Sequence, residues 1–156
     1  MLTENEKKEL QAALKKYPNR RSAVMDALRI VQNGRGGHIV KEDMLEIASI
    51  LEMQPAEVNA AATFYTMYNV NKPVGKHHIQ VCRNISCSLM GAEHIIKHLE
   101  RTLDIKTGQT TPDKKFTLST VECLGSCATA PMMQINDDYY ENLTDQKVDE
   151  ILKNLK

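Results

Sequence analysis

The four cysteines are the residues of this chain whose type and spacing could carry chemistry. Four residues separate Cys82 from Cys87, three separate Cys123 from Cys127, and 35 lie between the two pairs. Two loops that each supply two thiolates can enclose an Fe2S2 core with one pair on each iron, and such clusters are usually held by thiolates alone. Structural zinc sites use tighter hooks, most often with two residues between ligands. The spacing favours a 2Fe–2S cluster, with a zinc-stabilised interaction domain as the alternative.

The residues between the paired cysteines also suit a cluster. Small side chains and backbone amides in both loops can turn toward sulfur. An Fe2S2 core with four thiolates carries net negative charge, so amide donors and Arg83 would raise its reduction potential, whereas burial of the charge lowers it. Ordinary solvation of a loop is an equally good reading of Arg83 and Ser126.

The composition limits the compartment and the partners. Residues 1–8 are acidic and polar, whereas a secretory signal begins basic and then turns apolar. No apolar run approaches the roughly 18 residues of a membrane span. Lys plus Arg and Asp plus Glu both number 20, and nucleic-acid binding relies on a basic excess. We therefore expect a soluble protein in a reducing compartment, with no direct membrane insertion and no nucleic-acid partner.

In a reducing compartment, four cysteines are more often metal ligands or catalytic groups than structural disulfides. A third reading is therefore a thiol–disulfide oxidoreductase on a thioredoxin scaffold. Such enzymes carry Cys-x-x-Cys at a helix start, and this chain has no such motif. A chain of 156 residues can also bury enough surface to need neither disulfides nor metal merely to fold.

The first half of the chain is predicted to be helical. Residues 1–71 show short links between apolar stripes of helical period, which is typical of a small bundle. With a linker at 72–75, they make a first domain of residues 1–75. The expected helices are one behind a capping box of Thr3 and Glu6, two over residues 24–33 and 44–51, and one from Pro55 to Phe64.

The second half, residues 76–156, changes to an α/β pattern. The predicted order β-α-β-β-β-α fits a thioredoxin-like layer of helices on a sheet. Both cysteine pairs follow predicted strands, where loops gather at one end of a sheet. The expected elements are a strand over 78–81, a helix over 91–103, a strand over 116–121, a hairpin of 132–135 and 139–140, and a helix capped by Thr144.

Five motifs along the chain belong to one recognisable pattern. They are Ala62-Thr63-Phe64-Tyr65-Thr66, Val81-Cys82-Arg83-Asn84-Ile85-Ser86-Cys87, Gly91-Ala92-Glu93, Gly108-Gln109-Thr110-Thr111-Pro112-Asp113 and Glu122-Cys123-Leu124-Gly125-Ser126-Cys127. These motifs closely resemble the small 2Fe–2S subunit of bacterial complex I, the NADH-quinone oxidoreductase, within the thioredoxin-like ferredoxin family. The resemblance covers the chain from about residue 5 to residue 155, and its four-cysteine frame is specific.

The resemblance implies a helical region, a thioredoxin-like ferredoxin domain and ligation of one cluster by all four cysteines. It also implies an electron-transfer subunit of NADH dehydrogenase in the respiratory chain, which is cytoplasmic and peripheral to the inner membrane. FMN and NAD(H) would bind to a partner flavoprotein subunit, so this chain would not be catalytic with NADH on its own. The same module occurs in NAD(P)-linked hydrogenases and formate dehydrogenases, which stay as alternatives, although the loop Asn84-Ile85-Ser86 favours complex I.

Three further patterns allow weaker expectations. Residues 34–37, Gly-Arg-Gly-Gly, match neither spacing of a nucleotide loop and are predicted to end a helix. His94 and His98 lie four apart on one helix face but have no third ligand in view, so we expect a solvated or half-buried pair. Pro131 precedes a predicted strand where thioredoxin-like folds often place a cis proline, and the resemblance alone implies a cis bond there.

Overall fold

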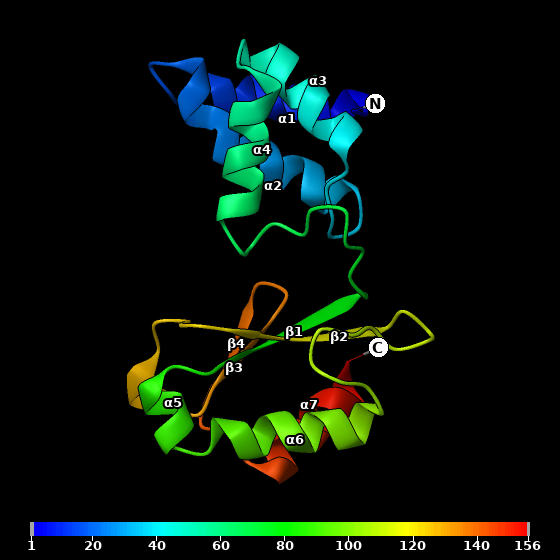
Figure 1. Cartoon of the computed structure of the whole chain (residues 1–156), viewed down its shortest axis with the longest axis vertical. Helices are drawn as coiled ribbons and strands as arrows, with labels where there is room; N and C mark the ends of the chain where they lie inside the picture. The colour runs from blue at the N-terminus through cyan, green and yellow to red at the C-terminus, as the bar shows by residue number, and fades with distance from the viewer. Residues whose placement is uncertain (1, 156) are drawn as a thin grey trace. The chain divides into compact units, whose positions relative to one another are not determined.

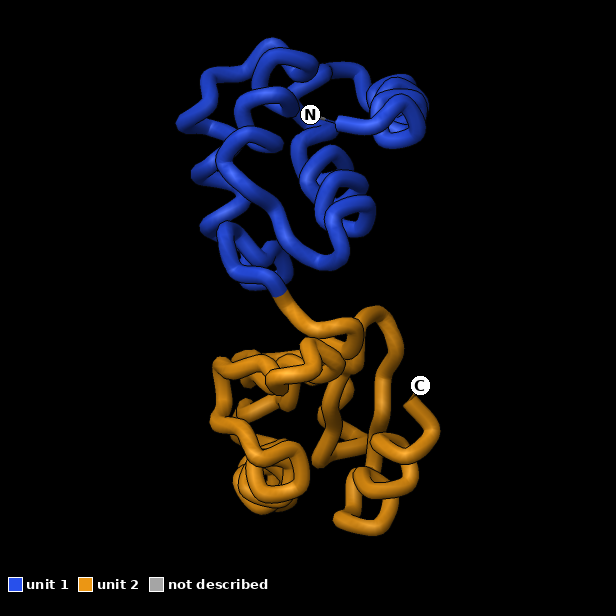
Figure 2. Tube along the Cα trace, turned by 90° about the vertical axis from the view of Figure 1, so that its right-hand side faces the viewer, with its two compact units in different colours: residues 1–73 blue, residues 74–156 orange. Residues whose placement is uncertain are grey.

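The computed structural model describes residues 2–155 and divides into two units, residues 1–73 and residues 74–156 (Figure 1, Figure 2). Among residues 2–73 the named elements are all helices, and the second unit contains a sheet with helices. An α/β chain that begins with a helical bundle was expected, and this fold class is confirmed. The predicted boundary after residue 75 lies two residues beyond the division between the units. Independent folding of the two parts stays a prediction.

The first unit is built from amphipathic helices with short links. The capping box forms as expected, because the Thr3 amide donates to the Glu6 carboxylate over 2.6 Å and the Glu6 amide donates to Thr3 Oγ1 over 3.3 Å. The helices of this unit are α1 (Glu4–Leu14), the 3-10 helix η1 (Arg20–Ala23), α2 (Val24–Gly34), α3 (Lys41–Leu51) and α4 (Pro55–Phe64).

Each long helix of the first unit turns one apolar face inward, and these faces form a single core. Leu10, Leu28, Ile47 and Val58 are fully buried representatives of α1 to α4. The segment of residues 34–37 ends α2 as predicted, since the Gly37 amide donates back to the Gln32 carbonyl over 2.8 Å.

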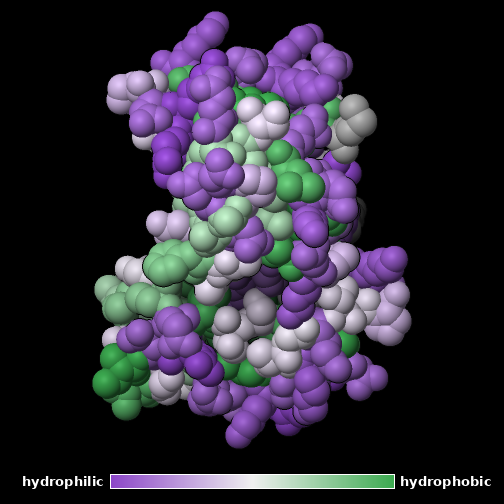
Figure 3. Space-filling model, turned by 45° about the horizontal axis from the view of Figure 1, so that its top comes forward, coloured by the Kyte–Doolittle hydropathy of each residue, from purple (hydrophilic) through white to green (hydrophobic). Residues whose placement is uncertain are grey.

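The aromatic run at the end of α4 is only partly used by this core. Tyr68 is buried and donates to the Met25 carbonyl over 2.9 Å. Phe64, Tyr65 and Met67 are exposed, with the Phe64 and Tyr65 rings in edge-to-face contact. Figure 3 shows a face of the molecule on which green apolar side chains interrupt a mostly purple hydrophilic surface.

The second unit is a four-stranded mixed sheet with helices on one side (Figure 1). The strand order is β2-β1-β3-β4; β1 pairs parallel with β2 and antiparallel with β3. The parallel pair runs in register from His77 opposite Phe116 to Cys82 opposite Val121. The elements are β1 (His77–Cys82), α5 (Ile85–Leu89), α6 (Ala92–Leu103), β2 (Phe116–Val121), η2 (Cys127–Thr129), β3 (Met133–Ile135), β4 (Asp138–Tyr140) and α7 (Asp145–Asn154).

Helices α6 and α7 cover the sheet and close its core. Ile95 and Leu99 on α6 pack with Leu118 of β2, and Val148 of α7 is fully buried in the same cluster. Thr144 caps α7 as predicted, because its hydroxyl accepts a hydrogen bond from the Lys147 amide over 3.2 Å.

The second unit differs from the prediction at one helix. The loop expected over Asn84-Ile85-Ser86 is instead the start of α5, whose first amide donates to Asn84 Oδ1 over 2.8 Å. The bond between Ala130 and Pro131 is cis, as the family resemblance implies. Among residues 2–155, no helix is long and apolar enough to cross a membrane.

Candidate functional site

The two cysteine pairs lie at the same end of the sheet because β1 and β2 run parallel and in register. Cys82 is the last residue of β1, and Cys123 is the second residue after β2. The parallel pairing extends into the loops, since the Arg83 amide donates to the Val121 carbonyl over 3.0 Å. Loops from the carboxyl ends of parallel strands meet at one edge. This geometry brings the two loops together, as the sequence predicts.

The first pair, Cys82 and Cys87, is held in a small apolar cluster. Both side chains are buried, at 3% and 2% exposed, and pack with Ala92, Ala130 and Met132. Cys82 is anchored further by its amide, which donates to the Met132 carbonyl over 3.2 Å. The strand and α5 therefore fix the inner half of the site in position.

The second pair, Cys123 and Cys127, is exposed. Between them, Gly125 adopts a positive φ of 80°, which favours glycine, and directs its amide to Cys123 Sγ over 3.3 Å. The carbonyl of Leu124 accepts a hydrogen bond from the Tyr139 hydroxyl over 2.8 Å. An amide donor to sulfur of this kind stabilises negative charge on a thiolate.

The thiols influence each other's ionisation. Burial opposes ionisation of Cys82, but the amides of Asn84 and Leu124, with the side chains of Cys87 and Cys123, outweigh burial and lower the pKa of Cys82 below its ordinary value. Burial, followed by the neighbouring Cys82, raises the pKa of Cys87 to about 11. One inner thiolate is therefore favoured over two.

The donor set fits a two-iron cluster in type and number. All four cysteines are free thiols. Cys82 is brought against Cys87 and Cys123, and Cys127 also raises the pKa of Cys87. Among the residues that the structure describes, no three His, Cys, Asp or Glu side chains are grouped closely enough to bind a single metal ion. A 2Fe–2S core does not need such a group, because it distributes its four thiolates over two irons.

Arg83 has a partner that the sequence did not indicate. Its guanidinium donates to one oxygen of Glu122, over 3.1 Å from Nε and 2.8 Å from Nη2. Arg83 follows Cys82 and Glu122 precedes Cys123, so the ion pair joins the two cysteine loops. Both side chains are largely exposed, so the pair adds little stability. Because its charge is paired, Arg83 acts less strongly on a cluster than a free cation would.

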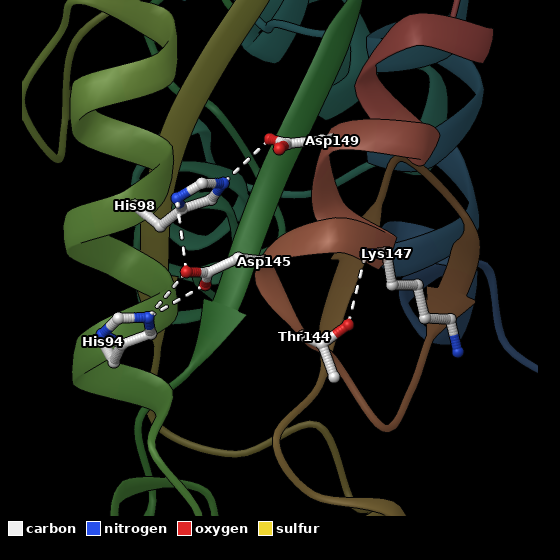
Figure 4. Close-up of polar contacts among 6 residues, drawn as sticks. All are labelled: His94, His98, Thr144, Asp145, Lys147 and Asp149. Carbon is white, nitrogen blue, oxygen red and sulfur yellow. Dashed lines mark hydrogen bonds and ion pairs between the residues drawn. The ribbon is translucent and has the colours of Figure 1, made fainter.

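His94 and His98 join α6 to α7 (Figure 4). His94 Nε2 lies 2.9 Å from both oxygens of Asp145, and His98 Nε2 lies 2.8 Å from Asp149. The hydrogen bond from His94 is the main reason that the pKa of Asp145 lies below its ordinary value. The histidines therefore pair with helix α7, which the pattern of residues 94 and 98 alone could not reveal.

The fold and the cysteine frame define the class of this protein, and comparison of its sequence agrees. The chain belongs to the thioredoxin-like [2Fe-2S] ferredoxin family, whose description matches residues 10–156.

Two relatives of this chain are E subunits of the same kind of enzyme. The chain is 47% identical over 150 residues to an E subunit of NADH-quinone oxidoreductase from Rhizobium meliloti (strain 1021), covering 96% of this chain and 88% of that protein. It is 45% identical over 153 residues to the E subunit of the same enzyme from Rickettsia prowazekii (strain Madrid E), covering 95% and 86%.

A solved structure shares the fold. An NAD+-reducing [NiFe]-hydrogenase in the air-oxidised state superposes with a TM-score of 0.71 at 20% identity, over 85% of this chain and 22% of the hydrogenase chain. At that identity the likeness concerns the fold alone.

Proposed function

We propose that this chain is the electron-transfer subunit of an NADH-quinone oxidoreductase. In this role it holds one 2Fe–2S cluster and exchanges single electrons with the FMN of a partner flavoprotein subunit. Family membership and the relatives at 45–47% identity over nearly the whole chain support this assignment. The observation that carries it is the meeting of two cysteine pairs at one end of the parallel strands β1 and β2.

The chain's own residues supply the ligands and the surroundings of the charge. Cys82, Cys87, Cys123 and Cys127 are the proposed ligands, one pair to each iron. When bound, such a cluster takes up and releases one electron at a time. The Gly125 amide faces Cys123 sulfur and favours the more negative state, whereas the apolar surroundings of the inner pair disfavour it.

Hydride chemistry with NADH is assigned to the partner subunit. Hydride transfer requires a nicotinamide or flavin carrier held in a dedicated site. The glycine-rich segment of residues 34–37 only ends α2, and the sequence contains no dinucleotide-binding motif. The proposed subunit is peripheral, at the cytoplasmic face of the inner membrane.

The order of reduction tests this function. Dithionite should bleach the visible spectrum of the isolated chain, whereas NADH should do so only after the flavoprotein subunit is added. The reason is that this chain holds a one-electron carrier and its partner the hydride acceptor. Rapid bleaching by NADH alone, in protein shown to be free of flavin, would contradict the assignment.

A further inference from the structure

Of the four cysteines, Cys127 has the weakest local support. Cys82 ends a strand, Cys87 lies within α5, and Cys123 follows β2 closely. Cys127 instead begins the 3-10 helix η2, which is three residues long and has no side-chain cap. A single turn of this kind has poor hydrogen-bond geometry and contributes little rigidity of its own. The turn is closed locally by Thr129, whose amide and hydroxyl lie 3.2 and 3.1 Å from the Ser126 carbonyl that they donate to, so its attachment to the rest of the second unit comes from other contacts.

Those contacts come from Glu141, the residue after β4. The Glu141 carboxylate accepts a hydrogen bond from the Ser126 hydroxyl, and another over 2.7 Å from the Thr129 hydroxyl. Ser126 precedes Cys127 and Thr129 ends η2, so one carboxylate oxygen holds both sides of the cysteine. Each hydroxyl has one proton to donate, and a carboxylate is the strongest acceptor in reach.

The segment that carries Glu141 is itself fixed to the same loop. The Asn142 amide donates to the Thr129 carbonyl over 2.7 Å, and the Lys147 ammonium donates to the Glu141 carbonyl over 2.5 Å. The hydrogen bonds from Ser126 and then Thr129 hold the pKa of the Glu141 carboxyl below its usual range. Its negative charge is therefore present at neutral pH, in contact with a proposed ligand loop.

We propose that Glu141 is a positioning residue for the cluster, which orients Cys127 through Ser126 and Thr129 and lowers the reduction potential. This inference rests on the proposed function. Reduction adds one negative charge to the cluster, and a fixed carboxylate nearby makes that addition less favourable. The hydrogen bonds and the charge are separate effects, so different substitutions can isolate them.

Two variants separate these effects. Glu141→Gln keeps an amide oxygen with two lone pairs, so it can accept both hydroxyls while the charge is lost. Glu141→Ala removes both the acceptor and the charge. The matched control is Glu100→Ala, because Glu100 in the same unit also accepts from a threonine, over 2.9 Å from the Thr107 amide and 3.2 Å from its hydroxyl.

The potential and loop order are measured separately. In the cluster-loaded full chain, an electrochemical titration should give a higher potential for both Glu141 variants than for the wild type and the control. In the cluster-free chain, amide hydrogen exchange across residues 126–129 should be about tenfold faster in Glu141→Ala, because the hydrogen bonds from the Ser126 and Thr129 hydroxyls to the carboxylate are lost. Exchange there should stay near the wild-type rate in Glu141→Gln, and exchange in α6 should not change.

The outcomes distinguish this inference from the proposed function. Wild-type protein that binds no iron–sulfur cluster would refute the proposed function. Wild-type protein with a cluster, but with unchanged potential and loop exchange in both Glu141 variants, would refute the positioning role alone. Glu141→Ala that behaves as Glu100→Ala does, with only a lower melting temperature, would reduce Glu141 to a structural residue and also overturn the inference.

Discussion

At the scale of single residues, the four proposed ligands differ in burial. Cys82 and Cys87 lie inside an apolar cluster, whereas Cys123 and Cys127 face solvent. A serine at an inner position would leave a hydroxyl in apolar surroundings, which costs about 1–3 kcal/mol unless it is paired. A serine at an outer position is solvated and can still offer an oxygen ligand.

Substitution of the ligands should therefore have graded effects. Cys82→Ser and Cys87→Ser should abolish the cluster, whereas Cys123→Ser and Cys127→Ser should weaken it. Iron and sulfide analysis after anaerobic purification should give about two of each per wild-type chain. Ser88→Ala, in which a hydroxyl that donates to the Arg83 carbonyl is lost, is the non-ligand control. Stoichiometric zinc without iron, after iron-replete expression, would instead favour the zinc-stabilised domain.

The histidine–aspartate pairs between α6 and α7 predict a pH dependence of stability. The pKa of Asp145 is lowered, first by the hydrogen bond from His94 and also by the charges of His98 and Arg101. A lowered folded-state pKa contributes stability above the unfolded value of about 3.9, and this contribution is lost as the pH falls through the folded value. Partial exposure of Asp145 keeps the effect small.

Asp145→Asn should thus be less stable than the wild type at pH 7. The difference between the two should shrink below about pH 4, where the wild-type carboxylate also becomes protonated. Melting of the cluster-free chain between pH 3 and 7 measures both effects. A constant difference across that range would show that Asp145 acts through packing and not through its charge.

At the scale of elements, α5 has a proposed ligand on one side and exposed apolar side chains on the other. Cys87 points inward, whereas Ile85 and Leu89, one turn apart, are 71% and 80% exposed. Met90, just beyond the helix, is exposed as well. Contiguous patches of exposed apolar side chains are typical of interaction sites. Since a helix is only about 10–12 Å across, a partner that covers this face would lie close to the cluster.

The double variant Ile85→Ser, Leu89→Ser should therefore weaken binding of the flavoprotein subunit about tenfold or more, as loss of interface anchors does. Its visible spectrum should match the wild type, because Cys87 is on the opposite face. Titration calorimetry with the isolated partner measures the affinity. Leu45→Ser, another exposed apolar position on α3, is the control, and an equal loss of affinity there would argue against a specific α5 surface.

The elements also show how far sequence reasoning reaches. Alternation of apolar and polar residues over 116–121 predicts β2 correctly, but its burial does not alternate, because Phe116, Thr117 and Leu118 are all buried. Helix α5 escapes prediction because five residues make little more than one turn, too short for a helical period to appear. The cysteines stand out by spacing alone. Glu141 could not be identified from the sequence, because its partners lie 12 and 15 residues away and no motif connects them.

At the scale of the whole molecule, the two units differ in what they contain. All four cysteines and all strands of the described chain belong to the second unit, which has its own core. The second unit begins at Val74. The next residue is already joined to the sheet, because the Gly75 amide donates to Thr117 Oγ1 over 2.6 Å. The first unit has a separate core and leaves Phe64, Tyr65 and Met67 exposed, which makes it a second candidate surface for the flavoprotein.

A chain shortened to residues 74–156 should therefore fold, assemble the cluster and keep nearly the full visible spectrum. It should co-purify less with the flavoprotein, because the aromatic surface of the first unit is gone. The full-length chain is the control in both measurements. A colourless, unfolded product would mean that the helices belong to the core of the cluster domain, and undiminished co-purification would mean that they have no docking role.

The two cysteine pairs lie at different depths, so they differ in how easily reagents in solution reach them. In the proposed site, solvent reaches Cys123 and Cys127 directly, whereas Cys82 and Cys87 lie beneath the surface. Oxidants arrive from the same direction, and the susceptibility of thiols follows their exposure. We therefore expect oxidation of the free thiols to begin at Cys123 and Cys127, so that the outer half of the proposed site is damaged before the inner half.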